Sequence, residues 1–450
     1  MKLHNHTKVH IISLGCPKNL IDSEVMGGLL SKSGRQLVNR PDLADIVIVN
    51  TCAFINPAKE EALEEILLLV KEKKEGNHPF RIVVAGCLAQ RYGKELFAEI
   101  PEVDLFMGVG EVANIVRNIN KLDGEKPQRA CIITKPDFLM TAQHVRALPD
   151  TAVSAYLKIS DGCSNCCSYC VIPAIRGKAR SRQPDDILRE AEMLAARGIK
   201  EIIITGQDTT AYGRDLKSHP RLPDLLNDMT RIKGIRWIRL LYAHPANITP
   251  EMMKSIAGNK KICRYIDLPV QHIDDNILEA MNRKVTGAGI KEIIVRAREI
   301  IPGVALRTSI IVGFPGETQK RFDKLLDFIR ETKFDHLGVF PYSREEGTKA
   351  ALLPSRISEK EKERRRDIIM NEQAAISHQI NQGIIGSTQE VLIEGKSDRL
   401  DYDYAGRCRR QAPEIDGITY VKGKPVRPGT IVRCRIIAAD DYDLFARIIN

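Results

Sequence analysis

The stretch YLKISDGCSNCCSYCVIPAIRG (residues 156–177) contains three cysteines, Cys163, Cys167 and Cys170, in the spacing CxxxCxxC. Three thiolates this close together on one loop can each bind one iron of a 4Fe-4S cube, which leaves the fourth iron open to a small molecule. A structural zinc site prefers four ligands in two CxxC pairs, and no second pair follows here. Cys166 breaks the spacing, so we do not expect it to be a ligand, and its role is left open.

Apolar runs with the pattern of strands alternate with helical patterns from residue 156 to about residue 340. The strand-like runs lie at 155–160, 201–206, 237–242, 265–270, 305–313 and 336–340, and amphipathic segments such as 184–198 separate them. Six such βα units predict an open, partial (β/α)6 barrel. The cysteine loop follows the first strand, which places it at the C-terminal face where barrel enzymes carry their active sites.

A second group of three cysteines occurs in the first 145 residues, which also alternate between strand and helix patterns. The runs VHIISLGC, DIVIVNTC and RIVVAGC end at Cys16, Cys52 and Cys87. This alternation predicts a doubly wound parallel sheet, in which the carboxyl ends of all strands meet at one edge. The three thiols should therefore converge and form a second cluster site with one open iron. Gly15 and Gly86 would allow a close approach of the backbone. The alternative is that these cysteines are small apolar core residues.

The last part of the chain, residues 382–450, loses the βα alternation. Short strand-like runs separated by Gly, Pro and Asp turns predict a small antiparallel β-barrel. The segment KGKPVRPGT (422–430) is predicted to be a hairpin connection. Such modules usually recognise a macromolecule, and the alternative is a domain that only packs on the rest of the protein. The predicted domains are therefore 1–145 for the sheet, 146–381 for the partial barrel and 382–450 for the C-terminal module.

The composition favours a soluble cytoplasmic protein with metal or redox chemistry. The chain has eleven cysteines and no signal-peptide apolar core, which argues against a disulfide framework. No stretch is apolar and long enough to cross a bilayer, so we expect no membrane partner. The net charge of +10 is spread along the chain, apart from a dense run at 358–367. That run favours either RNA or a ribosomal surface as partner, or simply the solvated face of a helix.

The loop at 163–170 resembles the cluster loop of radical S-adenosylmethionine (SAM) enzymes. The resemblance implies that the open iron binds the amino and carboxylate groups of SAM, and that an electron from the cluster cleaves SAM to a 5′-deoxyadenosyl radical. Arg307, within the fifth strand, is then the candidate for the SAM carboxylate, because a guanidinium pairs two oxygens in a fixed fork. Gln207, after the second strand, would bind the amino group, and Arg180 would add positive charge.

Further motifs extend the resemblance to nearly the whole chain, which is similar to the methylthiotransferases. The motifs are SLGCPKNLIDSE (13–24), NTCAFI (50–55), AGCLAQRY (85–92), the CxxxCxxC loop and IVGFPGET (311–318). Members of this family combine an N-terminal cluster domain, a radical SAM core and a TRAM domain. By position, the three N-terminal cysteines match the ligands of an auxiliary 4Fe-4S cluster, and the three loop cysteines match the ligands of the SAM-cleaving 4Fe-4S cluster.

Within the family, CPKNLIDSE, GQDTTAYG and APEIDG (412–417) resemble the branch that acts on ribosomal protein S-twelve. The resemblance implies methylthiolation of the β-carbon of one aspartate in that protein, either alone or in the small ribosomal subunit. It also implies an electron donor of flavodoxin or ferredoxin type and a sulfur donor. We expect substrate choice to depend on the C-terminal module, where Asp440, Asp441 and Asp443 would attract a basic ribosomal protein.

Two other functions remain open at this point. A transfer-RNA methylthiotransferase, acting on an adenosine beside the anticodon, belongs to the same family, and the basic net charge slightly favours it. A non-enzymatic iron–sulfur protein that senses redox state or carries electrons would explain the cysteines, but it would leave the large barrel unexplained.

Overall fold

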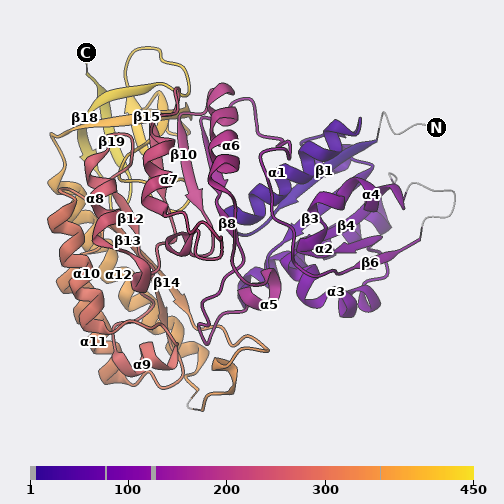
Figure 1. Ribbon diagram of the computed structural model, residues 1–450, viewed down its shortest axis with the longest axis horizontal. Helices are drawn as coiled ribbons and strands as arrows, with labels where there is room; N and C mark the ends of the chain where they lie inside the picture. Colours follow the sequence, from indigo (N-terminus) through magenta and orange to yellow (C-terminus); the bar gives the residue numbers. More distant parts are fainter. Residues whose placement is uncertain (1–6, 77–78, 123–127, 355, 450) are drawn as a thin grey trace. The chain divides into compact units, whose positions relative to one another are not determined.

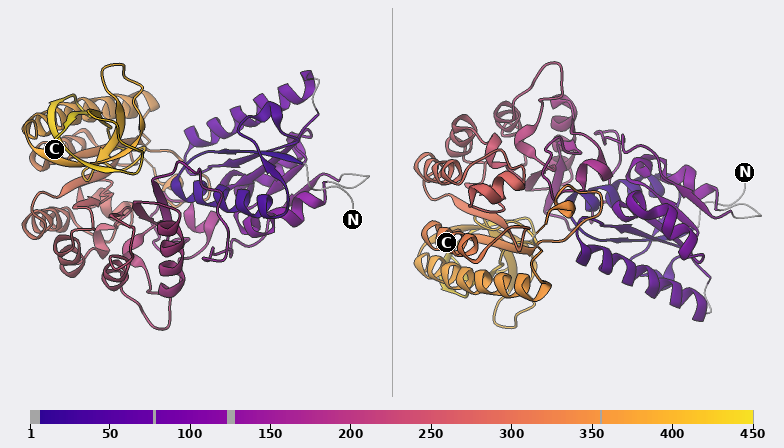
Figure 2. Two further views of the ribbon diagram at one scale, coloured as in Figure 1. Left: turned by 90° about the horizontal axis from the view of Figure 1, so that it is seen from above. Right: turned by 90° about the horizontal axis from the view of Figure 1, so that it is seen from below.

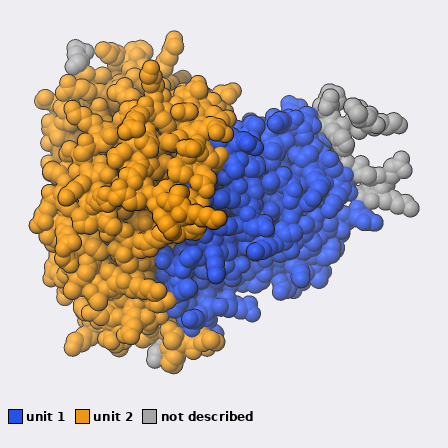
Figure 3. Space-filling model, viewed as in Figure 1, with its two compact units in different colours: residues 1–149, 158–182, 343–351 blue, residues 150–157, 183–342, 352–450 orange. Residues whose placement is uncertain are grey.

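The chain forms two compact units in a computed structural model that describes residues 7–76, 79–122, 128–354 and 356–449 (Figures 1 and 3). Unit 1 contains residues 1–149, 158–182 and 343–351, and unit 2 contains residues 150–157, 183–342 and 352–450. Residues 1–6, which begin the segment expected to lack a signal-peptide core, lie outside the described residues. Each unit combines segments that are distant in sequence, and unit 1 contains both groups of three cysteines.

Six strands form the sheet of unit 1, in the order β2-β1-β3-β4-β5-β6, and every pair of neighbours is parallel. The strands are β1 (Lys8–Ser13), β2 (Gln36–Leu37), β3 (Ile46–Thr51), β4 (Arg81–Gly86), β5 (Leu105–Met107) and β6 (Ala130–Ile132). Every residue of β3 is buried, as expected for a central strand of a parallel sheet covered on both faces. The predicted parallel sheet is confirmed.

Helices connect these strands. They are α1 (Pro17–Lys32), α2 (Asn56–Glu75), α3 (Cys87–Glu99) and α4 (Ile115–Asn120). On α2, the residues Ala62, Ile66 and Leu69 recur at helical spacing and are buried in the same core as β3 and β4. Two short antiparallel strands, β8 (Ser160–Asp161) and β9 (Arg180–Ser181), close the base of the cysteine loop, and α5 (Ile172–Arg176) lies between them.

The barrel strands of unit 2 form two three-stranded sheets, β11-β10-β7 and β12-β13-β14. The strands are β7 (Ser154–Lys158), β10 (Glu201–Thr205), β11 (Trp237–Leu240), β12 (Tyr265–Asp267), β13 (Ala305–Val312) and β14 (His336–Pro341). An isolated parallel bridge between Ile238 and Ile262 links the β11 side to the segment before β12. Each of the six runs predicted from the sequence overlaps one of these strands, so the six-strand partial barrel is confirmed.

The helices of unit 2 include one that begins with the run of charged residues at 358–367. They are α6 (Pro184–Ala196), α7 (Leu222–Met229), α8 (Pro250–Gly258), α9 (Asp275–Ala280), α10 (Gly287–Ile300), α11 (Gln319–Thr332) and α12 (Glu359–Gly383). The charge run at 358–367 opens α12, where Arg364 and Arg365 both pair with Glu361. Part of this positive charge is therefore offset along the helix itself, which favours the helix-face interpretation of the run. In the described part of the chain, no helix combines the length and apolarity needed to cross a membrane.

Five strands at the end of the chain close into a small barrel, drawn in yellow in Figure 2, in the order β15-β16-β17-β19-β18. They are β15 (Thr388–Lys396), β16 (Tyr404–Cys408), β17 (Thr419–Lys422), β18 (Ile431–Ala439) and β19 (Leu444–Ile448). The predicted barrel is confirmed, but the predicted hairpin at 422–430 is wrong. β17 pairs with β16 and, in parallel, with β19, so it does not pair with β18. Turn residues mark where a strand ends, and they do not determine which strand becomes its neighbour.

Candidate functional site

Cys16, Cys52 and Cys87, called the sheet triad from here on, lie just past three strands that are neighbours in the sheet. Cys16 precedes the first residue of α1, Cys52 follows β3, and Cys87 is the first residue of α3 directly after β4. In a parallel sheet these positions share one edge. The three thiols lie close enough for their charges to influence one another, so the structure brings the predicted residues together.

Two glycines make this close approach possible. Gly15 has a φ of +90°, and a Cβ built on it would lie 2.6 Å from the Cβ of Cys52. Gly86 has a φ of +93°, and its added Cβ would lie 2.3 Å from Oδ1 of Asn50. Any larger residue would push neighbouring cysteine loops apart, so both positions require glycine for conformation and for space.

The electrostatic surroundings of the sheet triad are asymmetric. Burial raises the pKa of the Cys87 thiol to about 12, against the opposing charge of Arg176. Burial and the neighbouring Cys16 also raise the pKa of Cys52. Burial acts in the same direction on Cys16, but the charges of Lys18 and Arg176 and two backbone N–H groups outweigh it, so the pKa of this thiol is lowered. Cys16 is thus the member most easily converted to the thiolate that binds metal.

Arg176, the last residue of α5, is the buried cation beside the sheet triad. Its Nη2 atom lies 3.7 Å from Sγ of Cys87 and 2.9 Å from Oδ2 of Asp22, and its Nη1 atom lies 3.0 Å from Oδ2 of Asp161. Lys158 completes the group, with its Nζ atom 2.5 Å from Asp22 and 3.2 Å from Asp161. Two cations and two carboxylates thus compensate one another's burial cost, which an isolated charge could not do.

Cys163, Cys167 and Cys170, called the loop triad from here on, are all half-buried. The backbone shapes their loop: the N–H of Cys163 donates to the carbonyl of Gly177 at 3.0 Å, and the N–H of Cys170 donates to the carbonyl of Cys167 at 3.1 Å. The intervening Cys166 is exposed, and its thiol lies 3.8 Å from the carbonyl of Ser164. The four cysteines of the loop therefore have two different environments.

The donor sets fit iron–sulfur clusters better than single metal ions. Among the residues that the structure describes, no three His, Cys, Asp or Glu side chains converge on a point that could hold one ion. In a 4Fe-4S cube each thiolate binds its own iron, so the sulfurs need not converge on one point. All cysteines in the described segments are free of disulfide bonds, which leaves both triads available as ligands.

The three residues predicted to contact SAM have different surroundings. Arg180, in unit 1, donates from Nη2 to the carbonyl of Arg176 at 3.0 Å. Gln207, in unit 2, is half-buried just after β10. Arg307 is the third residue of β13, near its N-terminal end, and pairs with Asp267 at 2.9 Å and with Asp416 at 3.6 Å. A SAM carboxylate would have to compete with these two carboxylates for Arg307, and the three SAM contacts stay predictions.

The acidic residues that the sequence singles out in the C-terminal module make contacts within the protein. The side chain of Asp416, in APEIDG, is completely buried against the barrel strands of unit 2. In the acidic group, Asp443 pairs with Arg399 at 3.1 Å and accepts the N–H of Ile418, and Asp441 pairs with His378 at 3.1 Å. Arg399, which also lies 3.8 Å from Asp440, therefore offsets part of this negative charge, and the group attracts a basic partner less strongly than its spacing in the sequence predicts.

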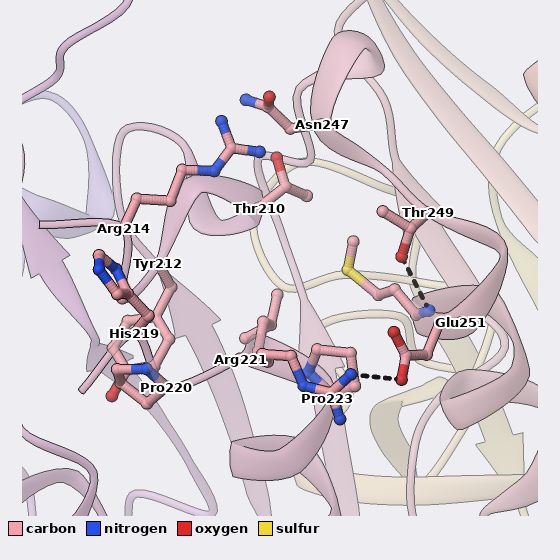
Figure 4. A pocket seen from close by; sticks show the side chains of 13 residues that line it. Thr210, Tyr212, Arg214, His219, Pro220, Arg221, Pro223, Asn247, Thr249 and Glu251 are labelled. Atoms are coloured by element: carbon pink, nitrogen blue, oxygen red, sulfur yellow. Dashed lines mark hydrogen bonds and ion pairs between the residues drawn. The ribbon is translucent and has the colours of Figure 1, made fainter. Parts of the chain in front are cut away.

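Sequence reasoning missed a pocket of about 210 Å³ in unit 2 (Figure 4). It is lined by residues of the GQDTTAYG segment, of the loop before α7 and of the turn before α8, so no local pattern marks it. In Figure 4, Arg214, Thr210 and Asn247 lie along one side, and the ion pair of Arg221 with Glu251 (2.7 Å) lies along the other. The three segments are far apart in the sequence, and the composition of each does not indicate that they line one pocket.

The carboxylate of Asp208 organises the backbone beside this pocket. It accepts hydrogen bonds from the N–H of Thr210 at 3.0 Å and from Nδ2 of Asn247 at 2.8 Å. The nearby His244 accepts the N–H of Ala246 at Nδ1, at 3.2 Å. Burial, with a contribution from Arg283, lowers the pKa of His244 to about 4, so its ring is neutral at physiological pH. We assign His244 a structural role at this turn.

Comparisons with known proteins match all parts of the chain. Family models described as uncharacterized protein family UPF0004, radical SAM superfamily and TRAM domain match residues 8–108, 157–329 and 385–449. A relative from Syntrophus aciditrophicus, named ribosomal protein uS12 methylthiotransferase RimO, is 56% identical over 448 residues, which are 99% of each chain. A relative of the same name from Geobacter sulfurreducens is 47% identical over 98% of this chain and 99% of its own.

Solved structures show the same fold at much lower sequence identity. The radical S-adenosylmethionine methyltransferase TsrM from Kitasatospora setae matches with a TM-score of 0.56 and 16% identity, over 86% of this chain and 81% of its own. The cobalamin-dependent radical enzyme OxsB matches with a TM-score of 0.52 and 13% identity, over 82% of this chain and 56% of its own. At this level of identity the likeness concerns the fold alone.

Proposed function

The chain belongs to the family of ribosomal protein uS12 methylthiotransferases, and we propose that it replaces a hydrogen on the β-carbon of one aspartate in uS12 by a methylthio group. The observation that carries this proposal is the 56% identity to a relative of that name across 99% of both chains. A transfer-RNA methylthiotransferase and a non-enzymatic redox protein lack such support, because the relatives named for uS12 match the whole chain.

The two triads divide the work of ligand binding in this proposal. The loop triad holds the SAM-cleaving 4Fe-4S cluster, and the sheet triad holds the auxiliary 4Fe-4S cluster. In each cluster, one iron has no side-chain ligand. When bound, these clusters and SAM supply the electron, the 5′-deoxyadenosyl radical and the methyl group. The protein positions the thiols: α5 follows the loop triad directly and ends at Arg176, which faces Cys87 of the sheet triad. No side-chain general base is assigned.

The remaining partners belong to the same proposal. Gln207, Arg307 and Arg180 are the proposed contacts of SAM. The substrate is uS12, either free or in the small ribosomal subunit. An electron donor of flavodoxin or ferredoxin type and a sulfur donor complete the reaction, which we place in the cytoplasm.

Anaerobic reconstitution with iron, sulfide and SAM, followed by mass analysis of uS12, tests the proposal. We expect a mass increase on one aspartate that equals a methylthio group in place of hydrogen. Transfer RNA serves as the competing substrate in a parallel reaction. Modification of an adenosine with unmodified uS12 would contradict the proposal in favour of the transfer-RNA activity, and the absence of SAM cleavage would favour a redox protein.

A further inference from the structure

Asn19, in the first turn of α1, is fully buried and contacts two of the three cysteine loops through its amide nitrogen. Nδ2 donates to the carbonyl of Leu14 at 3.1 Å and to the carbonyl of Thr51 at 2.9 Å. Leu14 lies two residues before Cys16, and Thr51 directly precedes Cys52. Both donor positions of the amide are therefore used to fix the backbones that carry the first two thiols of the sheet triad.

The carbonyl oxygen of the same side chain contacts the third loop. Oδ1 of Asn19 lies 3.6 Å from Sγ of Cys87, and it accepts a hydrogen bond from Nη2 of Arg176 at 2.6 Å. One amide group thus contacts all three cysteine loops and the buried cation. Neither an aspartate, which cannot donate, nor an apolar residue of similar size can make this set of contacts.

Arg176 carries the contact from the sheet triad to the loop triad. It lies six positions after Cys170, on the short helix that follows the cysteine loop. Its Nη2 atom faces Sγ of Cys87 at 3.7 Å and also lies 2.9 Å from Asp22, while its Nη1 atom lies 3.0 Å from Asp161. Hydrogen bonds to ligand sulfurs and nearby charge are two of the factors that set the reduction potential of an iron–sulfur cluster.

We propose that Asn19 and Arg176 are positioning residues of the auxiliary cluster site: Asn19 fixes the spacing of the three cysteine loops, and Arg176 donates to the Cys87 sulfur and stabilises the reduced cluster. The inference rests on the proposed function, because it assumes a cluster on the sheet triad. It goes beyond that function by assigning the charge and the geometry of the site to two residues that are not ligands. Such outer contacts orient the ligands of metal sites and tune them electronically.

A redox titration followed by electron paramagnetic resonance tests the role of Arg176. The full chain carries Cys163, Cys167 and Cys170 as Ala, so that only the auxiliary cluster contributes a signal. In Arg176→Gln the cation beside the sulfur is lost, so reduction becomes harder and the midpoint potential becomes more negative. We expect at least a tenfold change in the reduction equilibrium, which is about 59 mV for one electron. Arg176→Lys keeps the charge and should shift less.

Arg146→Gln is the matched control for this titration. Arg146 is also a buried arginine of unit 1 and also pairs with α1, through Glu24. We expect its midpoint potential to equal that of the parent. An equal shift in Arg146→Gln and Arg176→Gln would mean that loss of any buried cation near α1 explains the effect, and the role of Arg176 would be withdrawn.

Iron retention tests the role of Asn19 in the same background. Asn19→Asp replaces the donor to Leu14 and Thr51 by an acceptor, so two backbone carbonyls would face a carboxylate. We expect at least half of the auxiliary iron to be lost, and faster loss of the rest to a chelator. Asn120→Asp is the matched control, because Oδ1 of Asn120 also accepts from an arginine, Arg35, at 2.6 Å. Iron content unchanged in Asn19→Asp would overturn this role.

The outcomes separate this inference from the proposed function. If the parent with only the sheet triad binds no cluster, the assignment of the auxiliary site fails, and the inference fails with it. If the cluster forms and Arg176→Gln titrates like the parent, only the role of Arg176 is overturned. If Arg176→Gln holds no cluster, Arg176→Lys decides: a midpoint less than about 59 mV below that of the parent supports the role of the charge, and a larger negative shift despite the retained charge overturns it.

Discussion

The hydroxyl of Tyr265, at the start of β12, donates a 2.7 Å hydrogen bond to Oδ2 of Asp416 in the C-terminal module. The same carboxylate oxygen accepts the N–H of Ala412 at 2.7 Å, and Oδ1 lies 3.6 Å from Nε of Arg307. A carboxylate whose oxygens have these intramolecular partners is not free to contact a substrate. The APEIDG motif, which the sequence associates with substrate choice, therefore attaches the module to the barrel strands within unit 2.

Replacing Asp416 by Ala should destabilise unit 2 by about 3 kcal/mol, because it leaves the Ala412 N–H and the Tyr265 hydroxyl without their acceptor and removes one of the two carboxylates near Arg307. Thermal unfolding of the purified variant measures this loss. Tyr265→Phe removes one hydrogen bond while the carboxylate keeps its other contacts, so it should cost only about 1 kcal/mol. Equal unfolding temperatures for Asp416→Ala and the parent would show that the buried contacts contribute nothing.

Deleting residues 385–449 should destabilise the barrel in addition to changing substrate choice. The deletion removes Arg407, whose Nη2 atom lies 2.6 Å from the buried Glu201, and the carbonyl of Arg409, which accepts from Arg239 at 2.9 Å. Glu201 and Arg239 still pair with each other at 2.8 Å, but each loses a further buried partner, which should cost a few kcal/mol in total, about 1–3 kcal/mol for each lost contact. We expect a lower unfolding temperature and lower solubility. A truncated protein that unfolds like the parent and still modifies uS12 would refute this expectation.

Replacing the loop triad by Ala should remove about half of the iron and all SAM cleavage. The reason is that these three thiols are the proposed ligands of the SAM-cleaving cluster, while the sheet triad is unchanged. Iron analysis and chromatography of 5′-deoxyadenosine provide the two measurements. Cys166→Ala is the control within the same loop, and it should keep both iron and cleavage, because Cys166 is exposed. Formation of 5′-deoxyadenosine by the triple variant would exclude the assignment.

Replacing the sheet triad by Ala should separate SAM cleavage from product formation. The variant keeps the loop triad, so we expect some reductive cleavage of SAM but no methylthio group on uS12. Cys131→Ala is the control. Cys131 also lies in unit 1, but on β6, an edge strand of the sheet and not one of the three strands that precede the sheet triad. The measurement is the mass of uS12 beside the yield of 5′-deoxyadenosine. A normal product yield would disprove the two-cluster proposal.

The buried His244 should make stability fall at acidic pH. Its pKa is lowered to about 4 by burial, whereas the unfolded value is about 6.5. A group with a lowered folded pKa stabilises fully above the unfolded value, and this contribution is lost as pH falls toward the folded value. At pH 5 the loss amounts to about 2 kcal/mol.

Unfolding at pH 7 and pH 5, compared between the parent and His244→Asn, measures this effect. Asn keeps an acceptor for the N–H of Ala246 and does not titrate, so the variant should lose less stability between the two pH values. The same loss in both proteins would assign the acid sensitivity to other groups.

Local patterns in the sequence predict much of this fold, because the signals are local. The runs that end at Cys16, Cys52 and Cys87 coincide with β1, β3 and β4, since buried strands require continuous apolar residues. The meeting of the three thiols follows from the geometry of parallel sheets. Contacts between distant segments are different: Arg176 and Cys87 lie 89 positions apart, and no pattern near either residue indicates the other.

The motifs are recognisable in the sequence, but the physical roles of their residues are not. In SLGCPKNLIDSE, Asn19 contacts three loops, Asp22 binds Lys158 and Arg176, and Ser23 donates to Ser13 at 2.9 Å. These roles depend on where α1 lies against the rest of unit 1, which the motif itself does not contain. The same holds for Asp416, whose burial depends on the docking of the module on the barrel strands.

The position of β19 between β17 and β18 has a consequence for how the protein is made on the ribosome. A chain built only from successive hairpins can close its pairs one after another as they emerge. Here β17 and β18 each lack a neighbour until β19 has been synthesised, so both expose unpaired backbone groups during that interval. The last strand therefore closes the module in a single late step, and until then the nascent chain carries two open strand edges that can pair with other chains.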